Sequence, residues 1–222
     1  MKKYFWIYII AYLLVLTVVL GLLSEYPKLE LHLLLNAHHT PWQDTFFRYY
    51  STLAEWPFYV LALLPLCWKK WRLSLFYALC EATSGVTVQV LKHLFTMPRP
   101  AAAFEGHPDM VLPVVEGVRL HSSNSFPSGH TATFFVFITC CALLLTYYFH
   151  QRQAGRDSSL QPRLLLSGAL VLLVVLAALG GFSRIYLSQH FLSDVCVGSI
   201  IGVAVPCLLF YFVGDKILKL KS

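Results

Sequence analysis

Charged residues are scarce in this 222-residue chain. Asp, Glu, Lys and Arg together make up 13% of it, whereas 57% of the residues are hydrophobic and the mean hydropathy is +0.63. An ordinary soluble domain carries about 25% charged residues. This shortage argues against a soluble globular protein and predicts an integral membrane protein.

Cysteine patterns typical of a disulfide framework or a zinc site are also missing. No C-x-x-C pair with histidine partners occurs, and every cysteine lies in or at the end of an apolar stretch. We therefore expect buried, unpaired thiols. The chain lacks repeats, low-complexity tracts and Pro/Gly-rich linkers, which predicts a single domain over residues 1–222. No basic-aromatic patch favours nucleic acid as a partner.

Several apolar stretches approach the roughly 20 residues that a membrane-spanning helix needs. We predict spans at residues 4–23, 52–68, 72–91, 132–149, 163–182 and 195–213. The first span follows Lys2 and Lys3 like a signal peptide, but it is long and no small-residue cleavage site follows it, so we expect a retained helix. The predicted fold is all-α, a bundle of six transmembrane helices.

The stretch from 25 to 50 is too polar to span a membrane. Its leucines and aromatic residues predict interfacial helices in the first external loop. Asn36, His38, His39 and Asp44 either anchor this stretch among head groups or approach a ligand, and the sequence leaves both roles open.

Basic residues gather at alternate ends of the predicted spans. They lie at residues 2–3, 69–72, 152–163 and 216–221. Because short loops rich in Lys and Arg stay in the cytoplasm, we expect both termini there. The segments 24–51, 92–131 and 183–194 then face the opposite side, and these segments hold three polar clusters.

The first cluster, at 92–100, contains Lys92, Arg99 and Pro100. Proline disfavours helical geometry in the residue before it, so a helix ends before Arg99. A guanidinium holds two phosphate oxygens at once, and a lysine adds a compact positive charge. The alternative is positive charge at the membrane interface.

The second cluster, at 127–130, reads Pro127-Ser128-Gly129-His130 and opens an apolar stretch. Ser128 is a good N-cap, and Gly129 lets a ligand approach the backbone. The first N–H groups of such a helix form an anion site, and His130 would be placed to donate a proton to a leaving oxygen. The alternative is a simple helix cap.

The third cluster, at 183–194, contains Ser183, Arg184, His190 and Asp194. His190 and Asp194 are four residues apart, so we expect them on one face of a helical turn. A carboxylate that accepts a hydrogen bond from one imidazole nitrogen leaves the other nitrogen as a nucleophile. Arg184 adds a third cation.

Together the three clusters resemble the signature motifs of the type 2 phosphatidic acid phosphatase superfamily, in the family's order and spacing. The resemblance covers residues from about 90 to 213, and the hydropathy is similar to that of the family's membrane lipid phosphatases. It implies that His190 attacks phosphorus to form a phosphohistidine, that Asp194 orients His190, and that His130 protonates the leaving group. It also implies that the phosphate is held by these residues: Lys92, Arg99, Ser128, Gly129 and Arg184. No metal or other cofactor is implied.

The resemblance implies a phosphorylated lipid in the surrounding membrane as substrate. The outward-facing clusters favour a bacterial envelope lipid, lipid A or undecaprenyl pyrophosphate, and an inner-membrane enzyme whose site faces the periplasm. Phosphatidylglycerol phosphate and phosphatidic acid are alternatives. A lipid phosphotransferase, or a protein that only binds anionic head groups, also stays open. The motifs recognise phosphate and do not specify the alcohol.

Overall fold

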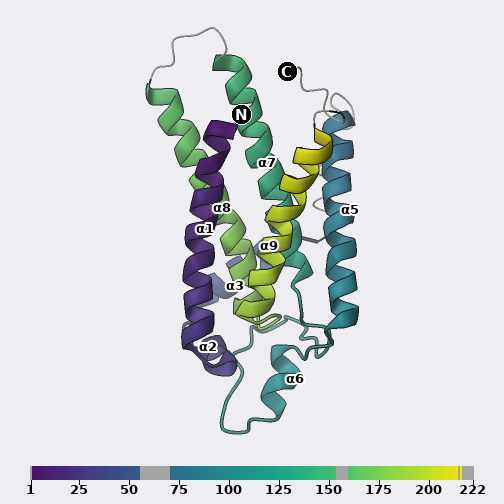
Figure 1. The fold of residues 1–222 in the computed structure, drawn as a ribbon. Helices are drawn as coiled ribbons and strands as arrows, with labels where there is room; N and C mark the ends of the chain where they lie inside the picture. The colour runs from purple at the N-terminus through teal and green to yellow at the C-terminus, as the bar shows by residue number, and fades with distance from the viewer. Residues whose placement is uncertain (1, 56–70, 154–159, 215, 217–222) are drawn as a thin grey trace.

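The structure is a computed structural model that describes residues 2–55, 71–153, 160–214 and 216. Within these ranges all regular elements are helical. The long helices are α1 (Lys2–Glu25), α5 (Trp71–Leu94), α7 (Gly129–Gln153), α8 (Leu160–Tyr186) and α9 (Leu192–Leu209), the last continuing as the π-helix η1 (Phe210–Gly214). The short helices are α2 (Lys28–Leu35), α3 (Pro41–Thr52) and α6 (Pro100–Glu105). The long helices form one bundle, with α2 and α6 at the same end of it (Figure 1).

Four helices in the described ranges are long and apolar enough to cross a membrane. They are Tyr4–Glu25, Gly129–Arg152, Leu160–Tyr186 and Leu192–Gly214. Helix α5 is equally long but more polar, because it carries Glu81 and Lys92 among other polar residues. The span predicted at 52–68 lies mostly outside the described residues. The chain is an integral membrane protein, and the count of six spans stays a prediction.

The helices extend beyond the apolar stretches that predicted them. Helix α5 continues past residue 91 and includes Lys92, and α8 continues past residue 182 and includes Arg184. Hydropathy indicates where the bilayer ends, whereas the backbone hydrogen bonds of a helix continue into the polar region. Arg184 therefore lies on the last turn of α8. The sequence had instead indicated the external turn.

Helices α7 and α9 pack closely because glycines remove side chains from their interface. A Cβ on Gly198 would lie 2.6 Å from Ser128 O, and one on Gly202 would lie 2.6 Å from Ala132 O. Small residues four apart allow such close approach of two membrane helices. The start of α7 is thereby fixed against α9, which brings the second and third polar clusters together.

Replacing Gly198 with alanine is expected to lower stability, because the new methyl group meets backbone and Thr131 Cβ at 3.2 Å. Overpacking of this kind costs about 1–3 kcal/mol. Gly168→Ala on α8 is the matched control, since no atom lies within 4 Å of its Cβ position. Thermal unfolding in detergent, followed by circular dichroism, measures both variants. Equal unfolding midpoints of the two variants would contradict the close contact between α7 and α9.

The five cysteines in the described residues are unpaired, as expected: Cys80, Cys140, Cys141, Cys196 and Cys207. Cys67 lies outside those residues.

The largest buried core joins α1, α7, α8 and α9. It contains Tyr8, Phe135, Leu170 and neighbouring side chains. This core holds the helices whose ends carry the polar clusters.

Candidate active site

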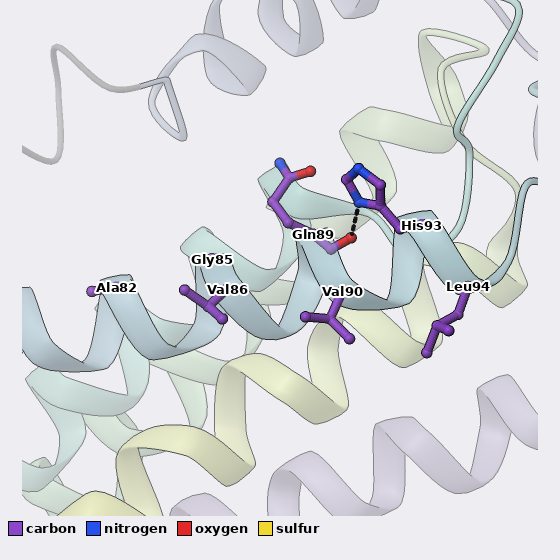
Figure 2. A pocket seen from close by; sticks show the side chains of 7 residues that line it. All are labelled: Ala82, Gly85, Val86, Gln89, Val90, His93 and Leu94. Atoms are coloured by element: carbon purple, nitrogen blue, oxygen red, sulfur yellow. Dashed lines mark hydrogen bonds between the residues drawn. The ribbon is translucent and has the colours of Figure 1, made fainter.

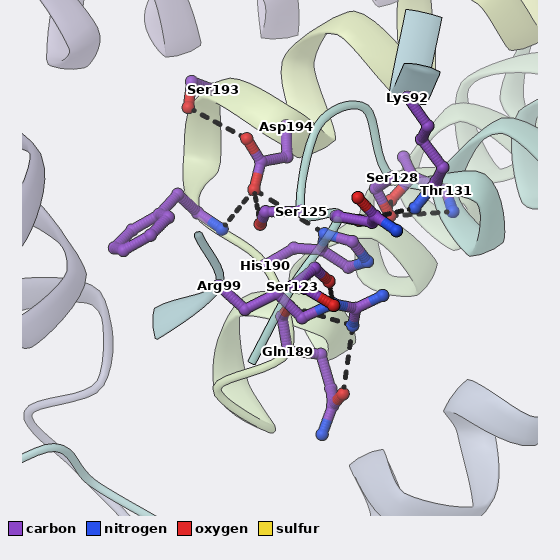
Figure 3. A network of polar contacts seen from close by, with 12 residues as sticks. Lys92, Arg99, Ser123, Ser125, Ser128, Thr131, Gln189, His190, Ser193 and Asp194 are labelled. Carbon is purple, nitrogen blue, oxygen red and sulfur yellow. Dashed lines mark hydrogen bonds and ion pairs between the residues drawn. The ribbon is translucent and has the colours of Figure 1, made fainter. Parts of the chain in front are cut away.

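Residues of the three predicted clusters lie close together, among them Lys92, Ser128 and His190 (Figure 3). Lys92 comes from the end of α5, Arg99 from the segment before α6, and His130 from the start of α7. His190 lies between α8 and α9, and Asp194 lies in the first turn of α9. The tertiary structure therefore brings together residues about a hundred positions apart.

His190 and Asp194 form a buried pair. Nδ1 of His190 lies 3.6 Å from Oδ2 of Asp194 and has no hydrogen-bond partner among the described residues. The two residues are 1% and 0% exposed. The separation is slightly longer than a hydrogen bond, as is common in ligand-free active sites. A small movement would let Nδ1–H donate to the carboxylate and leave Nε2 as the nucleophile.

Asp194 is held by its own contacts at the start of α9. Its Oδ2 accepts hydrogen bonds from Ser125 Oγ at 2.5 Å and from the backbone N–H of Phe191 at 3.0 Å. Phe191 is the N-cap, so His190 precedes the helix and does not share a helical face with Asp194. The predicted helical turn was wrong in this detail. A carboxylate at the third helical position reaches back to the N-cap, which brings Asp194 to His190 from the side.

The pH dependence of the reaction should reflect the burial of His190. Its pKa is lowered to about 4, chiefly by burial and to a smaller extent by Arg184 and Arg99, while the hydrogen bond and charge of Asp194 oppose the shift. Only a neutral imidazole can act as the predicted nucleophile, so we expect activity to be lost as the pH falls through this value. We expect kcat/KM to stay near its maximum at about pH 5.5 and to fall near about pH 4, because this ratio reports the free enzyme. A fall centred near the ordinary histidine pKa of about 6.5 would contradict this prediction.

The cations are fixed by backbone carbonyl groups. Lys92 Nζ donates to Asn124 O at 2.7 Å, and Arg99 Nε donates to Ser123 O at 2.9 Å. Arg99 Nη1 also lies 3.3 Å from both oxygens of Gln189. Burial lowers the pKa of Arg99, although a guanidinium stays charged at neutral pH. Both cations are therefore oriented before any ligand binds.

Arg184 is buried on the last turn of α8. Its Nη1 donates a hydrogen bond to Ser51 Oγ of α3, and its Nε has no partner among the described residues. A buried donor without a partner is uncommon and requires a physical explanation. Arg184 can therefore offer an N–H group to an anion.

The start of α7 agrees in part with the prediction. Ser128 Oγ accepts hydrogen bonds from Thr131 Oγ1 at 2.9 Å and from Thr131 N at 3.4 Å, which makes Ser128 a helix cap. Ser128 N donates to Asp194 O at 3.0 Å. Gly129 and His130 line the cavity described next, whereas Ser128 is buried behind them. A direct contact of Ser128 with phosphate stays a prediction.

A cavity of about 530 Å³ opens between α5, α7 and the end of α3. Among its lining residues are Lys92, Arg99, Gly129, His130 and His190. Glu55 supplies the acidic group in this lining. The cavity therefore contains the predicted nucleophile, the predicted acid and two of the predicted cations.

A second groove runs along the outer face of α5 and is almost wholly apolar (Figure 2). It includes Val86, Val90 and Leu94, and it shares Gly85 and Gln89 with the polar cavity. The polar cavity thus adjoins an apolar surface.

The sequence did not indicate several residues that hold this site, among them Ser51, Asn124, Ser125 and Gln189. Gln189 lies inside the third motif and next to His190, so its position was a usable signal. Asn124 has a left-handed φ of 55°, and its carbonyl oxygen accepts the hydrogen bond from Lys92. Ser51 gave no signal, since it lies on a separate helix far away in the sequence.

The sequence left open whether the polar residues of the first loop anchor it among head groups or approach a ligand. His39 Nδ1 lies 3.0 Å from Asp44 Oδ1, which also accepts a hydrogen bond from Tyr186 at 2.5 Å. His39 stacks on Tyr186 with ring centroids 4.1 Å apart. These contacts attach α3 to α8, and neither His39 nor Asp44 lines the polar cavity. His38 does not line it either.

A metal centre has no support among the described residues. No group of three or more His, Cys, Asp or Glu side chains there is arranged to hold an ion. Metal independence of the reaction stays a prediction. Its physical rationale is the positive charge of the three basic side chains.

Both the fold and the sequence of the chain are similar to those of known proteins. The structure resembles Aquifex aeolicus LpxE, with 26% sequence identity, a TM-score of 0.59, and coverage of 85% of this chain and 98% of that one. It also resembles a transmembrane PAP2-type phosphatidylglycerolphosphate phosphatase from Bacillus subtilis, with 20% identity, a TM-score of 0.60, and coverage of 93% and 96%. No curated protein matches the chain. The PAP2 superfamily model matches residues 73–218, a range that includes all three motifs, and the chain therefore belongs to the PAP2 superfamily.

Proposed function

We propose that this protein is a membrane phosphatase that hydrolyses the phosphate monoester or pyrophosphate of a lipid through a phosphohistidine intermediate. The observation that carries the proposal is the buried His190–Asp194 pair beside a cavity lined by His130, Lys92 and Arg99. A site that only binds anions needs the cations but not a nucleophile with an orienting carboxylate.

In the proposed first step, Nε2 of His190 attacks phosphorus and the bond from phosphorus to the leaving oxygen breaks. His130 donates a proton to that oxygen, and Asp194 stabilises the imidazole through Nδ1–H. Water then attacks the phosphohistidine, its proton passes to His130, and inorganic phosphate leaves. The phosphorus–nitrogen bond breaks in this second step, so the two steps together return His190 and His130 to their starting states.

The cations are proposed to hold the equatorial phosphate oxygens, where charge accumulates in the transition state. Lys92 and Arg99 line the cavity, and Arg184 offers its unpaired Nε from behind it. The N–H groups that open α7 at Gly129 and His130 have no partner within the helix and add further donors. These groups supply positive charge where other phosphoryl-transfer enzymes use Mg²⁺.

Two features support a lipid as the substrate. The chain is an integral membrane protein, and the apolar groove on α5 shares Gly85 and Gln89 with the polar cavity. A phosphate in the cavity would leave its hydrocarbon chain next to that apolar surface. We propose a bacterial envelope lipid, lipid A or undecaprenyl pyrophosphate, with phosphatidylglycerol phosphate and phosphatidic acid as alternatives.

We propose that the site faces the periplasm from the inner membrane. The start of α1 and the end of η1 lie at the end of the bundle opposite to the polar clusters (Figure 1). The sequence has basic residues at 2–3 and 216–221, near its two termini. Because basic residues at the ends of spans favour the cytoplasm, we propose that this opposite end is the cytoplasmic one.

The test is phosphate release by purified protein in detergent, with a chelator present and with each of the four lipids as substrate. We expect release from at least one lipid and inhibition by vanadate, which mimics pentacoordinate phosphorus. Mass spectrometry of the lipids separates hydrolysis from transfer, since a phosphorylated acceptor without free phosphate indicates a phosphotransferase. Activity that needs an added metal, or that vanadate leaves unchanged, would contradict the proposed mechanism.

A further inference from the structure

His32 of α2 lies outside all three motifs, yet its side chain is only 2% exposed and reaches the turn that carries His190. We propose that His32 is a positioning residue that holds His190 in place for attack by fixing both sides of the turn. This inference rests on the proposed function and adds a residue to the same site.

On one side His32 contacts Ser188, two residues before His190. His32 Nε2 lies 3.2 Å from Ser188 Oγ, and Ser188 Oγ donates its own proton to Pro113 O at 2.6 Å. Asn36 Nδ2 also lies 3.4 Å from His32 Nε2, but both of its N–H groups donate to backbone carbonyl oxygens at 3.1 Å. Because the Ser188 proton is also used, Nε2 of His32 carries the hydrogen in the contact with Ser188. The geometry thus assigns His32 as the donor and Ser188 as the acceptor.

On the other side His32 packs against Phe191, the residue after His190. The ring centroids are 5.3 Å apart and the planes are 68° apart, which is an edge-to-face contact. Lys28 covers the same Phe191 ring with its ammonium group 4.0 Å from the centroid. The backbone N–H of Phe191 also donates a hydrogen bond to Asp194. The contact between His32 and Phe191 therefore affects both members of the His190–Asp194 pair.

Asn36, one turn further along α2, holds α2 against the same segment. Its Nδ2 donates to Ile185 O and to His32 O, both at 3.1 Å. Leu31 adds an apolar contact, since it shares a buried cluster with Ile185 and Leu192. Helix α2 is therefore fixed to the end of α8 and the start of α9, and His32 is held rigidly.

The turn needs such support because Ser188 has a left-handed φ of 50°. This conformation is unfavourable for a residue other than glycine, because its Cβ comes too close to the following carbonyl oxygen. Residues in such conformations persist where the surrounding contacts fix them. Backbone hydrogen bonds from Ser188 and His190 to the end of α8 also hold this turn. Within the described part of the chain, the Ser188 side chain bonds to His32 and Pro113, and loss of these bonds should loosen the turn and displace His190.

His32 stays neutral at ordinary pH, as a donor of this kind requires. Burial lowers its pKa to about 4, with Asp194 raising and Lys28 lowering it to a smaller extent. The tautomer with Nε2–H can therefore persist over the range in which the enzyme would be assayed.

The test compares His32→Leu, which removes the donor at similar volume, with His32→Gln, whose amide N–H can reach Ser188. We expect His32→Leu to lower kcat about 10- to 100-fold at nearly constant KM, because small misplacements of a reacting group have effects of this size. His32→Gln should stay within about threefold of wild type, since the donor is retained. His107→Leu, an exposed histidine beyond α6, is the matched control and should behave like wild type.

A second measurement does not depend on turnover. Carbethoxylation of His190 by diethyl pyrocarbonate, followed by mass spectrometry, should be several-fold faster in His32→Leu than in wild type and unchanged in His32→Gln. If wild type releases no phosphate from any lipid, the proposed function fails, and the rate of carbethoxylation still decides the role of His32.

Ser188→Ala provides the same test from the acceptor side if His32→Leu does not fold. It should lower kcat and expose His190 in the same way. Wild-type kcat and labelling in His32→Leu or Ser188→Ala would overturn the inference. An equal loss in His32→Leu and His32→Gln, in step with reduced thermal stability, would overturn it as well, because it would indicate a merely structural role.

Discussion

Replacing His190 with alanine is expected to abolish phosphate release. The proposed reaction has no other nucleophile, and loss of the nucleophile in enzymes that form a covalent intermediate costs about 10⁶-fold in kcat. Radiolabelled lipid phosphate, quenched in alkali to preserve phosphohistidine, should label wild type and leave His190→Ala unlabelled. The purified variant should remain folded, because one side chain at the end of the bundle is removed while the core among α1, α7, α8 and α9 is intact.

The matched control is His150→Ala, a histidine on the last turn of α7 at the far end of the same helix. It should retain wild-type kcat and labelling. Thermal unfolding of all three proteins separates loss of chemistry from loss of fold. Phosphate release by a folded His190→Ala protein at the wild-type rate would remove the basis of the phosphohistidine mechanism.

Replacing Asp194 with asparagine is expected to lower kcat about 10³- to 10⁴-fold, as neutralising the orienting aspartate does in hydrolase triads. Asparagine keeps an oxygen that can accept the hydrogen bond from Phe191 N, so the start of α9 should stay formed. It loses the negative charge that stabilises the imidazole of His190. Steady-state kinetics should show a fall in kcat with a small change in KM.

Asp44→Asn is the control for this second variant. Asp44 also pairs with a histidine, His39, at 3.0 Å, but the pair lies outside the polar cavity. Its kcat should stay within about threefold of wild type, since exposed or partly exposed ion pairs contribute little. Equal losses in both variants would indicate a general effect of removing a carboxylate and would argue against a special role for Asp194.

The helices and the motif residues were predictable because each depends on local sequence. Apolar stretches gave the approximate positions of α1, α5, α7, α8 and α9, and Pro100 correctly indicated the end of the preceding helix. Arg99 has the extended backbone expected before a proline, with φ −80° and ψ 167°. The ends of the helices were less predictable, since hydropathy does not determine where backbone hydrogen bonding stops.

The supporting contacts could not be predicted, because they depend on how distant segments pack. Ser51 accepts a hydrogen bond from the buried Arg184 guanidinium, and Ser125 donates one to Asp194. Neither serine has a distinctive neighbour in the sequence. His32 is a similar case, since its partner Ser188 is 156 residues away. The motifs predict which groups would contact the phosphate, and the fold was needed to find the groups that hold them.

The position of the polar cavity at one end of the bundle has a consequence for the energetics of a lipid substrate. Inorganic phosphate would leave into the water at that end, while the dephosphorylated lipid would remain in the leaflet beside α5. The two products would then occupy different phases, and dilution of the phosphate would keep them from recombining. Partitioning between water and bilayer would drive the reaction forward without any coupled energy source.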